Sequence, residues 1–329
     1  MSDYDAPAPL IRPRHNRRSQ AIRDMVAETH FDVAQLIVPL FIIPGEGVRK
    51  EIPSMPGIYQ RSIDESAREI AECLELGLTS YLLFGVPTYK DAEGSAAWQE
   101  DGIIQLALQR FTKDFPEAHL IADLCFCEYT DHGHCGVIVN DGVDNDQTLL
   151  NLGRQAVSLA QAGVHTVAPS GMMDGMVAAI RGALDEADFS EVAILSYAVK
   201  YASALYGPFR EAVDCAPSFG DRHAYQMDPR NRSEAILEAG LDTDEGADML
   251  MVKPAGMYMD IISDLKSNYP LPVVAYQVSG EYSMIKAASD KGWLDGKQLM
   301  VESLTALFRA GADAVITYFA REMAEYRRQ

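Results

Sequence analysis

Two lysines stand at the ends of short apolar runs, where an amine could be made nucleophilic. Lys253 closes the run 248–253 and is followed by Pro254, and Lys200 closes the run 194–200. Runs this short predict buried strands rather than helices. Burial lowers the pKa of a lysine, and two lysines on neighbouring strands should lower each other's pKa further. The pattern favours a Schiff-base site, although either lysine alone could instead snorkel out of the core.

Three cysteines follow another apolar run at a spacing that suits a metal ion. Cys125 lies near the end of the run 119–126, Cys127 directly follows the run, and Cys135 lies in the loop beyond it. In an extended chain Asp123, Cys125 and Cys127 would all point the same way. Three thiolates can hold Zn²⁺ and leave a fourth position for water or substrate, which is the arrangement of a catalytic zinc site.

Two alternatives stay open for this cluster. The thiols could be buried and inert, and His132 or His134 could replace one thiolate as a ligand. The chain has five cysteines, an odd number of which three are clustered. This usage indicates a metal site in a reducing compartment rather than disulfides, and it predicts a cytoplasmic location.

Further polar residues follow other apolar runs. The segment 201–232 is long and poor in regular patterns, which predicts a lid or binding loop. Within it, Arg210 and Arg222 could clamp a substrate carboxylate, or either could form a surface ion pair. Ser279 and Tyr318 follow two later runs, which would bring their hydroxyls to the same rim.

The elements that must position these residues form a repeated pattern. Helical stretches end at Gly77, Gly163, Gly246 and Gly311, and each glycine is followed by a short apolar run. Helical patterns cover 63–76, 148–162, 172–184, 233–241 and 297–310. Eight apolar runs predict strands, at 36–43, 80–85, 119–126, 166–170, 192–198, 248–253, 272–278 and 314–318.

Eight strands with helices between them predict a single α/β domain, a (β/α)8 TIM barrel over residues 33–329, rather than an open doubly wound sheet. No glycine-rich dinucleotide or phosphate fingerprint argues otherwise. Such barrels place catalytic groups at the C-terminal ends of their strands. The two lysines, the cysteines and the lid should therefore meet at one rim.

Composition restricts the partners of the chain. Its 329 residues carry a net charge of −20, which disfavours binding to nucleic acid or to a membrane surface. No apolar stretch is long enough for a secretory signal or a transmembrane helix. Residues 1–32 nevertheless contain five arginines, and we expect them to form an N-terminal arm that packs on a neighbouring subunit. The alternative is a solvated flexible tail.

Four motifs together carry a resemblance to a known family. They are Met-Val-Lys-Pro at 251–254, Lys200 with Tyr-Gly-Pro-Phe-Arg at 206–210, the cysteine loop with His-Gly-His-Cys-Gly at 132–136, and Tyr-Gln-Val-Ser-Gly-Glu-Tyr at 276–282. These motifs closely resemble those of the porphobilinogen synthases, also called δ-aminolevulinic acid dehydratases. The resemblance extends over nearly the whole chain.

The resemblance implies a barrel with an N-terminal arm, assembled as a homo-octamer. It implies a lyase that condenses two molecules of 5-aminolevulinate to porphobilinogen, with loss of two waters, in tetrapyrrole and heme biosynthesis. Lys253 would form the Schiff base with the first substrate, whose carboxylate would meet Ser279 and Tyr318. Lys200 would be a second Schiff-base lysine or a proton-transfer group.

The resemblance also implies how the second substrate binds. It would lie near a zinc ion held by Cys125, Cys127 and Cys135, with its carboxylate facing Arg210, Arg222 and Gln226 under the lid. The pocket would be completed by Asp123, Ser170, Tyr206 and Phe209. These roles are chemically coherent, because one ketone would be activated as an imine and the other polarised by a Lewis acid.

The family varies in its metals. Some relatives replace the cysteines with acidic residues and use Mg²⁺, but this chain keeps all three cysteines, so we expect zinc. Glu238 matches a position that binds an allosteric Mg²⁺ in some bacterial relatives, and the alternative for it is an exposed helix glutamate. Gly171 stands where some relatives carry an acid, which leaves Asp174 as a candidate carboxylate.

Two other functions stay open at this point. A class I aldolase-type enzyme would also need a barrel lysine, but it has no use for the cysteine cluster. A non-catalytic metal-binding or assembly protein would explain the cysteines and the arm but not the two lysines.

Overall fold

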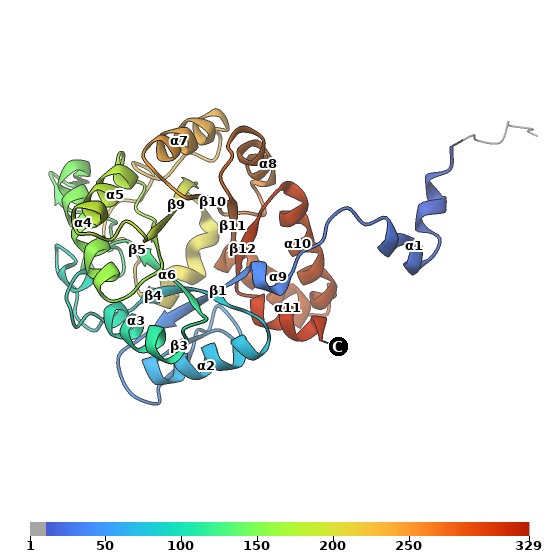
Figure 1. Cartoon of the computed structure of the whole chain (residues 1–329), viewed down its shortest axis with the longest axis horizontal. Coiled ribbons are helices and arrows are strands. Elements are labelled where there is room, and N and C mark those ends of the chain that lie inside the picture. The colour runs from blue at the N-terminus through green and yellow to red at the C-terminus, as the bar shows by residue number, and fades with distance from the viewer. Residues whose placement is uncertain (1–10, 329) are drawn as a thin grey trace, which may run out of the picture.

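The computed structural model describes residues 11–328, and in this part of the chain eight parallel strands close into a barrel (Figure 1). Consecutive barrel strands pair with one another, and the last pairs with the first through Leu36↔Val315 and Ile37↔Ile316. The TIM-barrel prediction is confirmed. The barrel strands are β1 (Leu36–Ile42), β4 (Ser80–Gly85), β5 (His119–Leu124), β8 (Thr166–Pro169), β9 (Ala193–Lys200), β10 (Met249–Lys253), β11 (Val273–Gln277) and β12 (Ala314–Thr317).

These strands form where apolar residues run without interruption, because both faces of a barrel strand are covered. All seven residues of β1 are buried. Helices surround the barrel (Figure 1), and the buried apolar residues come from both the strands and these helices. Those helices are α2 (Ile63–Glu75), α3 (Ile103–Asp114), α4 (Asn145–Gln161), α5 (Met176–Glu186), α7 (Ser233–Asp244), α8 (Met259–Asn268), α9 (Ser279–Asp290), α10 (Gly296–Ala310) and α11 (Ala320–Arg327).

The glycines predicted to end helices adopt the backbone conformation that favours glycine. Gly77, Gly163, Gly246 and Gly311 all have positive φ, a conformation that side chains with a Cβ rarely adopt. Four of the five predicted helices are confirmed to within a few residues. The helix predicted at 172–184 begins only at Met176, because Met172 and Gly175 both have positive φ and form a turn after β8.

The third barrel strand is shorter than the sequence suggests. β5 ends at Leu124, so Cys125 and Cys127 lie in the turn beyond it. The expectation that Asp123, Cys125 and Cys127 share one face through strand alternation is therefore wrong. Two hairpins were also not expected: β2 (Arg49–Glu51) with β3 (Tyr59–Arg61), and β6 (Ile138–Val139) with β7 (Gly142–Val143).

A β-bulge separates the two ends of β9. Ser196 pairs with Leu250 and Val199 pairs with Val252, so three steps along β9 match two steps along β10. Ser196 and Lys200 would share a face in a regular strand, but the extra residue reverses this relation. The Ser196 hydroxyl donates a hydrogen bond to Asp242 on α7, outside the barrel. Lys200 instead lines the cavity at the barrel mouth, and in the strand register it lies opposite Lys253.

The segment 201–232 covers the mouth of the barrel. It contains a 3-10 turn (Ala204–Tyr206) and α6 (Gly207–Val213), which lies over the barrel centre in Figure 1. The segment therefore has more regular structure than its sequence suggests. A hydrogen bond joins the end of α6 to β3, because Gln60 Nε2 donates to the carbonyl of Ala212 at 2.6 Å.

The first part of the described N-terminal arm lies apart from the barrel (Figure 1), whereas near the end of the arm Phe31 is buried and stacks on Phe308 of α10 with ring centroids 4.5 Å apart. It forms a 3-10 turn (Pro13–Arg17) and α1 (Gln20–Met25), and neither contains a buried residue. The first ten residues of the predicted arm lie outside the described residues. Across residues 11–328, no helix combines the length and the apolar character needed to cross a membrane.

Candidate active site

Lys253 is enclosed by aromatic rings at the mouth of the barrel. Its Nζ lies 4.4 Å from the ring centroid of Tyr276, 5.0 Å from that of Tyr197, 5.1 Å from that of Phe209 and 5.3 Å from that of Tyr206. The residue is 6% exposed. Burial, and then the positive charge of Lys200, lower the pKa of Lys253 to about 7. The neutral amine, which is the nucleophilic form, is therefore accessible to Lys253 near neutral pH.

Lys200 is just as buried, at 5% exposed, but its pKa is shifted in the opposite direction. Its Nζ donates a hydrogen bond to the carbonyl of Ser170. Burial lowers the pKa of Lys200, but the negative charge of the cysteine cluster, Cys135 first, outweighs burial and leaves that pKa raised. The prediction that the two lysines lower each other's pKa is thus right for Lys253 and wrong for Lys200.

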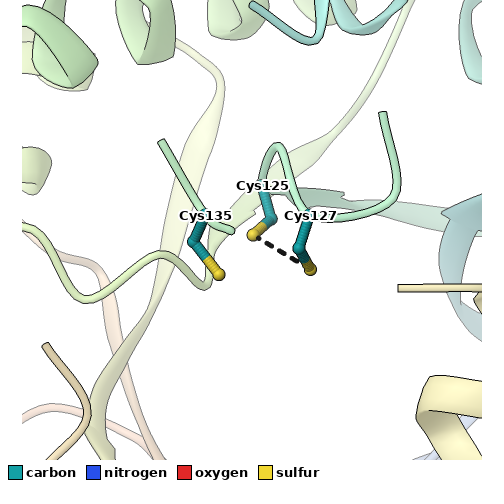
Figure 2. Close-up of side chains that lie close together, drawn as sticks. All are labelled: Cys125, Cys127 and Cys135. Atoms are coloured by element: carbon teal, nitrogen blue, oxygen red, sulfur yellow. Dashed lines mark hydrogen bonds between the residues drawn. The ribbon is translucent and has the colours of Figure 1, made fainter. Parts of the chain in front are cut away.

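The three predicted cysteine ligands converge although two of them have left the strand (Figure 2). The Sγ atoms of Cys125 and Cys127 are 3.6 Å apart, and all three sulfurs lie within 4.8 Å of one another. Tetrahedral zinc with Zn–S bonds of about 2.3 Å needs sulfurs about 3.8 Å apart. The buried three-sulfur donor set therefore fits zinc.

Both ring nitrogens of each nearby histidine, His132 and His134, already have a hydrogen-bond partner. His134 contacts the carbonyl of Phe219 through Nε2 at 3.0 Å and the hydroxyl of Tyr225 through Nδ1 at 3.1 Å. His132 contacts the carbonyl of Ala92 through Nε2 at 3.1 Å, and its Nδ1 accepts from the backbone N–H of His134. Because a carbonyl only accepts, each Nε2 carries the proton, and each Nδ1 is occupied as an acceptor. Neither histidine has a free lone pair for a metal, so the histidine-ligand alternative is wrong.

A small closed cavity lies between the lid and the barrel. Its volume is about 20 Å³, which is room for about one water molecule, so a larger substrate requires the lid to move. The cavity brings together one cysteine of the cluster, both lysines and both lid arginines. Its lining comprises Phe84, Asp123, Cys127, Glu128, Ser170, Lys200, Tyr206, Phe209, Arg210, Arg222 and Lys253.

Asp123 adds a buried carboxyl group to this cavity. Burial, and then the negative charge of Glu128, raise the pKa of Asp123 to about 7. One of its oxygens accepts a hydrogen bond from the Ser170 hydroxyl at 3.1 Å. The other is buried and has no hydrogen-bond partner among the described residues. A carboxyl group with this pKa can take up or release a proton near neutral pH.

Three predicted substrate-binding residues lie outside the cavity lining. The Ser279 hydroxyl accepts from the backbone N–H of Phe209 at 3.0 Å, which holds the lid. The Tyr318 hydroxyl lies 3.0 Å from that of Tyr276, whose ring contacts Lys253. Gln226 instead lines a separate cavity of about 370 Å³.

Glu238 faces that second cavity together with Asp174 and Glu234. Burial, and then the charges of Asp174 and Glu234, raise the pKa of Glu238. Glu238 is half-buried rather than exposed on its helix, and its role as a Mg²⁺ ligand stays a prediction.

Several residues of the site received no role from the sequence. Tyr197 and Tyr276 form the aromatic enclosure of Lys253, and Glu128 lines the cavity. Glu281 accepts from the backbone N–H groups of Gly256 and Val278, both at 2.7 Å, and so joins the loop after Lys253 to the start of α9. Their signals are weak, because an inward tyrosine or a glutamate in the first turn of a helix is common.

Comparison with known proteins now decides the family. Residues 10–326 match the family model described as delta-aminolevulinic acid dehydratase. The chain belongs to this family. It is 55% identical over 315 residues to the delta-aminolevulinic acid dehydratase of Halalkalibacterium halodurans, covering 96% of each chain. It is 52% identical over 322 residues to that of Synechococcus elongatus, covering 97% of this chain and 99% of the relative.

A solved structure supports the same family. The crystal structure of delta-aminolevulinic acid dehydratase (porphobilinogen synthase) from Toxoplasma gondii, in complex with the reaction product porphobilinogen, matches with a TM-score of 0.95 and 42% identity. The match covers 97% of this chain and 92% of the other. The family is one of lyases in porphyrin biosynthesis, so the aldolase and the non-catalytic alternatives are set aside.

Proposed function

We propose that Lys253, Lys200 and the cysteine cluster carry out the family's reaction, the condensation of two molecules of 5-aminolevulinate to porphobilinogen with loss of two waters. One observation carries this proposal. Two equally buried lysines face one cavity, and burial lowers the pKa of Lys253 to about 7 while the neighbouring thiols leave the pKa of Lys200 raised. One amine is therefore available as a nucleophile and the other as a cation.

Lys253 attacks the ketone carbon of the first 5-aminolevulinate. A carbon–nitrogen bond forms, the carbonyl oxygen leaves as water, and the product is an imine on the lysine. The ammonium group of Lys200 supplies a proton to the departing oxygen. Asp123, whose pKa burial raises to about 7, exchanges protons with substrate on the other side of the cavity.

The two substrate carboxylates bind at different places. The first meets the hydroxyls of Ser279 and Tyr318, near the aromatic enclosure of Lys253. The second faces Arg210 and Arg222, which line the cavity of the two lysines, and Gln226, which lines the separate cavity and follows Arg222 by four residues in the lid. Each has a buried side-chain nitrogen without a hydrogen-bond partner among the described residues. Ser170, Tyr206 and Phe209 complete the pocket as the lid closes.

The metals follow from the donor atoms. Cys125, Cys127 and Cys135 would hold Zn²⁺, which when bound supplies a Lewis acid for the second ketone. Glu238 would bind an allosteric Mg²⁺ in the cavity that it shares with Asp174 and Glu234. Magnesium in proteins commonly takes one or two carboxylates and keeps several waters, which suits this sparse set.

Assembly and location belong to the same proposal. The N-terminal arm has no buried residues in the described 13–17 and 20–25 elements, which supports packing on another subunit of a homo-octamer. The five cysteines are all free, which supports a reducing, cytoplasmic environment.

Trapping of the imine tests the central step. Sodium borohydride is added to the protein with 5-aminolevulinate, and the modified lysine is located by peptide mass spectrometry. We expect a stable secondary amine at Lys253. Modification of Lys200 alone, or no modification of a fully active protein, would overturn the assignment.

A further inference from the structure

The cysteine loop and the lid are joined by contacts that the proposed chemistry does not use. The metal loop, residues 130–136, presents two backbone carbonyls to the lid. That of His132 accepts from the backbone N–H of Ser218 at 3.0 Å, and that of Gly133 accepts from Arg222 Nη2 at 2.8 Å. The lid arginine proposed to bind a carboxylate is therefore held directly by the metal loop.

His134 adds the side-chain part of this junction. Its ring joins the Phe219 carbonyl to the Tyr225 hydroxyl, and it packs on the Phe219 ring with centroids 4.6 Å apart. Phe219 and Tyr225 lie on either side of Arg222 in the chain. The next residue after His134 is Cys135, one of the three sulfur donors. One buried ring thus links a metal ligand to both flanks of the lid arginine.

Backbone packing makes the junction stiff. Gly133 has a φ of +70°, and a Cβ at this position would lie only 2.5 Å from the carbonyl oxygen of Ala216 in the lid. The two backbones are therefore in direct contact. A displacement of the metal loop must displace the lid, since closely packed segments do not deform continuously.

We propose that His134 is a positioning residue that couples metal binding at the three cysteines to the order of the lid segment 215–226. The inference deepens the proposed function and rests on its metal site and on Arg222 as a carboxylate-binding group. Metal binding fixes Cys135, the fixed loop holds His134, and His134 holds Arg222 in place through Phe219 and Tyr225. Because coupling is reciprocal, the lid contacts must also strengthen metal binding.

The decisive measurement is hydrogen–deuterium exchange of peptides from 215–226 as Zn²⁺ is added to the metal-free full-length protein. In the unaltered protein, exchange in this segment should slow as the cluster fills. In His134→Ala the zinc affinity, measured by competition with a chromogenic chelator, should fall about tenfold, since two ordinary hydrogen bonds are lost. Slowing of exchange in 215–226 should then no longer follow zinc occupancy.

Two milder variants keep the test decisive if His134→Ala folds poorly. Tyr225→Phe removes only one hydroxyl, and His134→Gln keeps an N–H that can reach the Phe219 carbonyl. Both should give intermediate coupling. His165→Ala is the matched control, because His165 precedes β8 at the opposite end of the barrel, where its ring Nδ1 accepts from the backbone N–H of Leu120. It should leave the coupling unchanged.

Kinetics separate positioning from general destabilisation. At saturating zinc, His134→Ala should raise the KM for 5-aminolevulinate about tenfold and change kcat less than threefold, whereas a loss of folding would lower kcat. The coupling is overturned if zinc does not slow exchange in 215–226, or slows it equally in His134→Ala. Failure of the borohydride adduct at Lys253 with intact coupling would instead overturn only the proposed chemistry.

Discussion

Lys253 and Lys200 lie side by side on paired strands and are almost equally buried, yet their surroundings shift their pKa values in opposite directions. Around Lys253 the nearest groups are aromatic rings and a second cation. Around Lys200 they are the carbonyl of Ser170 and the cysteine cluster, in which the neighbouring thiols hold the pKa of Cys135 well below its usual value. Burial alone lowers the pKa of both, so the difference comes from the neighbours. The comparison shows that the groups facing each lysine set the direction of its pKa shift. These groups therefore decide which lysine can act as the nucleophile and which stays a cation.

The largest effect should follow removal of the nucleophile. Lys253→Met should lower kcat/KM by on the order of 10⁴-fold or more, because the covalent step has no other neutral amine beside it. The exposed Lys291→Met is the matched control and should be silent. Steady-state kinetics on correctly folded protein measures both. If kcat/KM of Lys253→Met stayed within tenfold of that of the unaltered protein, Lys253 would not be the nucleophile. The proposed difference in role between the two lysines would then be wrong.

Removal of a thiol tests the other half of the comparison. Cys135→Ala should weaken Zn²⁺ binding more than about 100-fold, since a ligand matters more than the outer groups that support it. It also removes the strongest charge that raises the pKa of Lys200, so that pKa should fall. Chelator competition gives the zinc affinity, with the distant Cys73→Ala as control. Equal zinc affinity in both variants would contradict the cluster as the metal site.

The pH dependence of imine trapping reports the charge state of Lys253. Its neutral form reacts, and its pKa is lowered to about 7, so the trapping rate should rise about tenfold per pH unit below 7 and level off above it. Lys200→Met removes a positive charge that lowers this pKa, so the midpoint should move to higher pH. The borohydride trapping rate from pH 5 to 9 measures both. A midpoint that stays fixed would mean that the lysines do not interact, and one that moves down would contradict the sign of the interaction.

The smallest effect belongs to Ser196, which the bulge turns away from the mouth. Ser196→Ala leaves the buried Asp242 without its hydroxyl donor, so the free energy of unfolding should fall by about 1–2 kcal/mol. Activity should stay within twofold. Urea unfolding at fixed protein concentration and steady-state kinetics test the two statements. A large loss of activity with unchanged stability would place Ser196 on the same side as Lys200.

The sequence predicted the site most accurately where the signal is local. Lys253 ends an apolar run before Pro254, and both the strand and its buried terminal lysine are confirmed. Asp123 and Ser170 were expected in one pocket and are hydrogen-bonded across β5 and β8. The cysteine cluster was predicted for an incomplete reason. Its sulfurs meet because a turn follows Leu124 and because Cys135 returns from the loop, not because a strand alternates.

The sequence by itself determined the barrel, because eight apolar runs and the glycines that end the preceding helices depend on residues close together in the chain. The tertiary structure decided the chemistry of the mouth. The bulge turned Lys200 inward, and the cysteine cluster raised its pKa. Contacts with the lid occupied His134, and contacts with Ala92 and the backbone of His134 occupied His132. These outcomes depend on electrostatic and hydrogen-bonding neighbours far apart in sequence, and only the closed barrel brings those neighbours within a few ångströms.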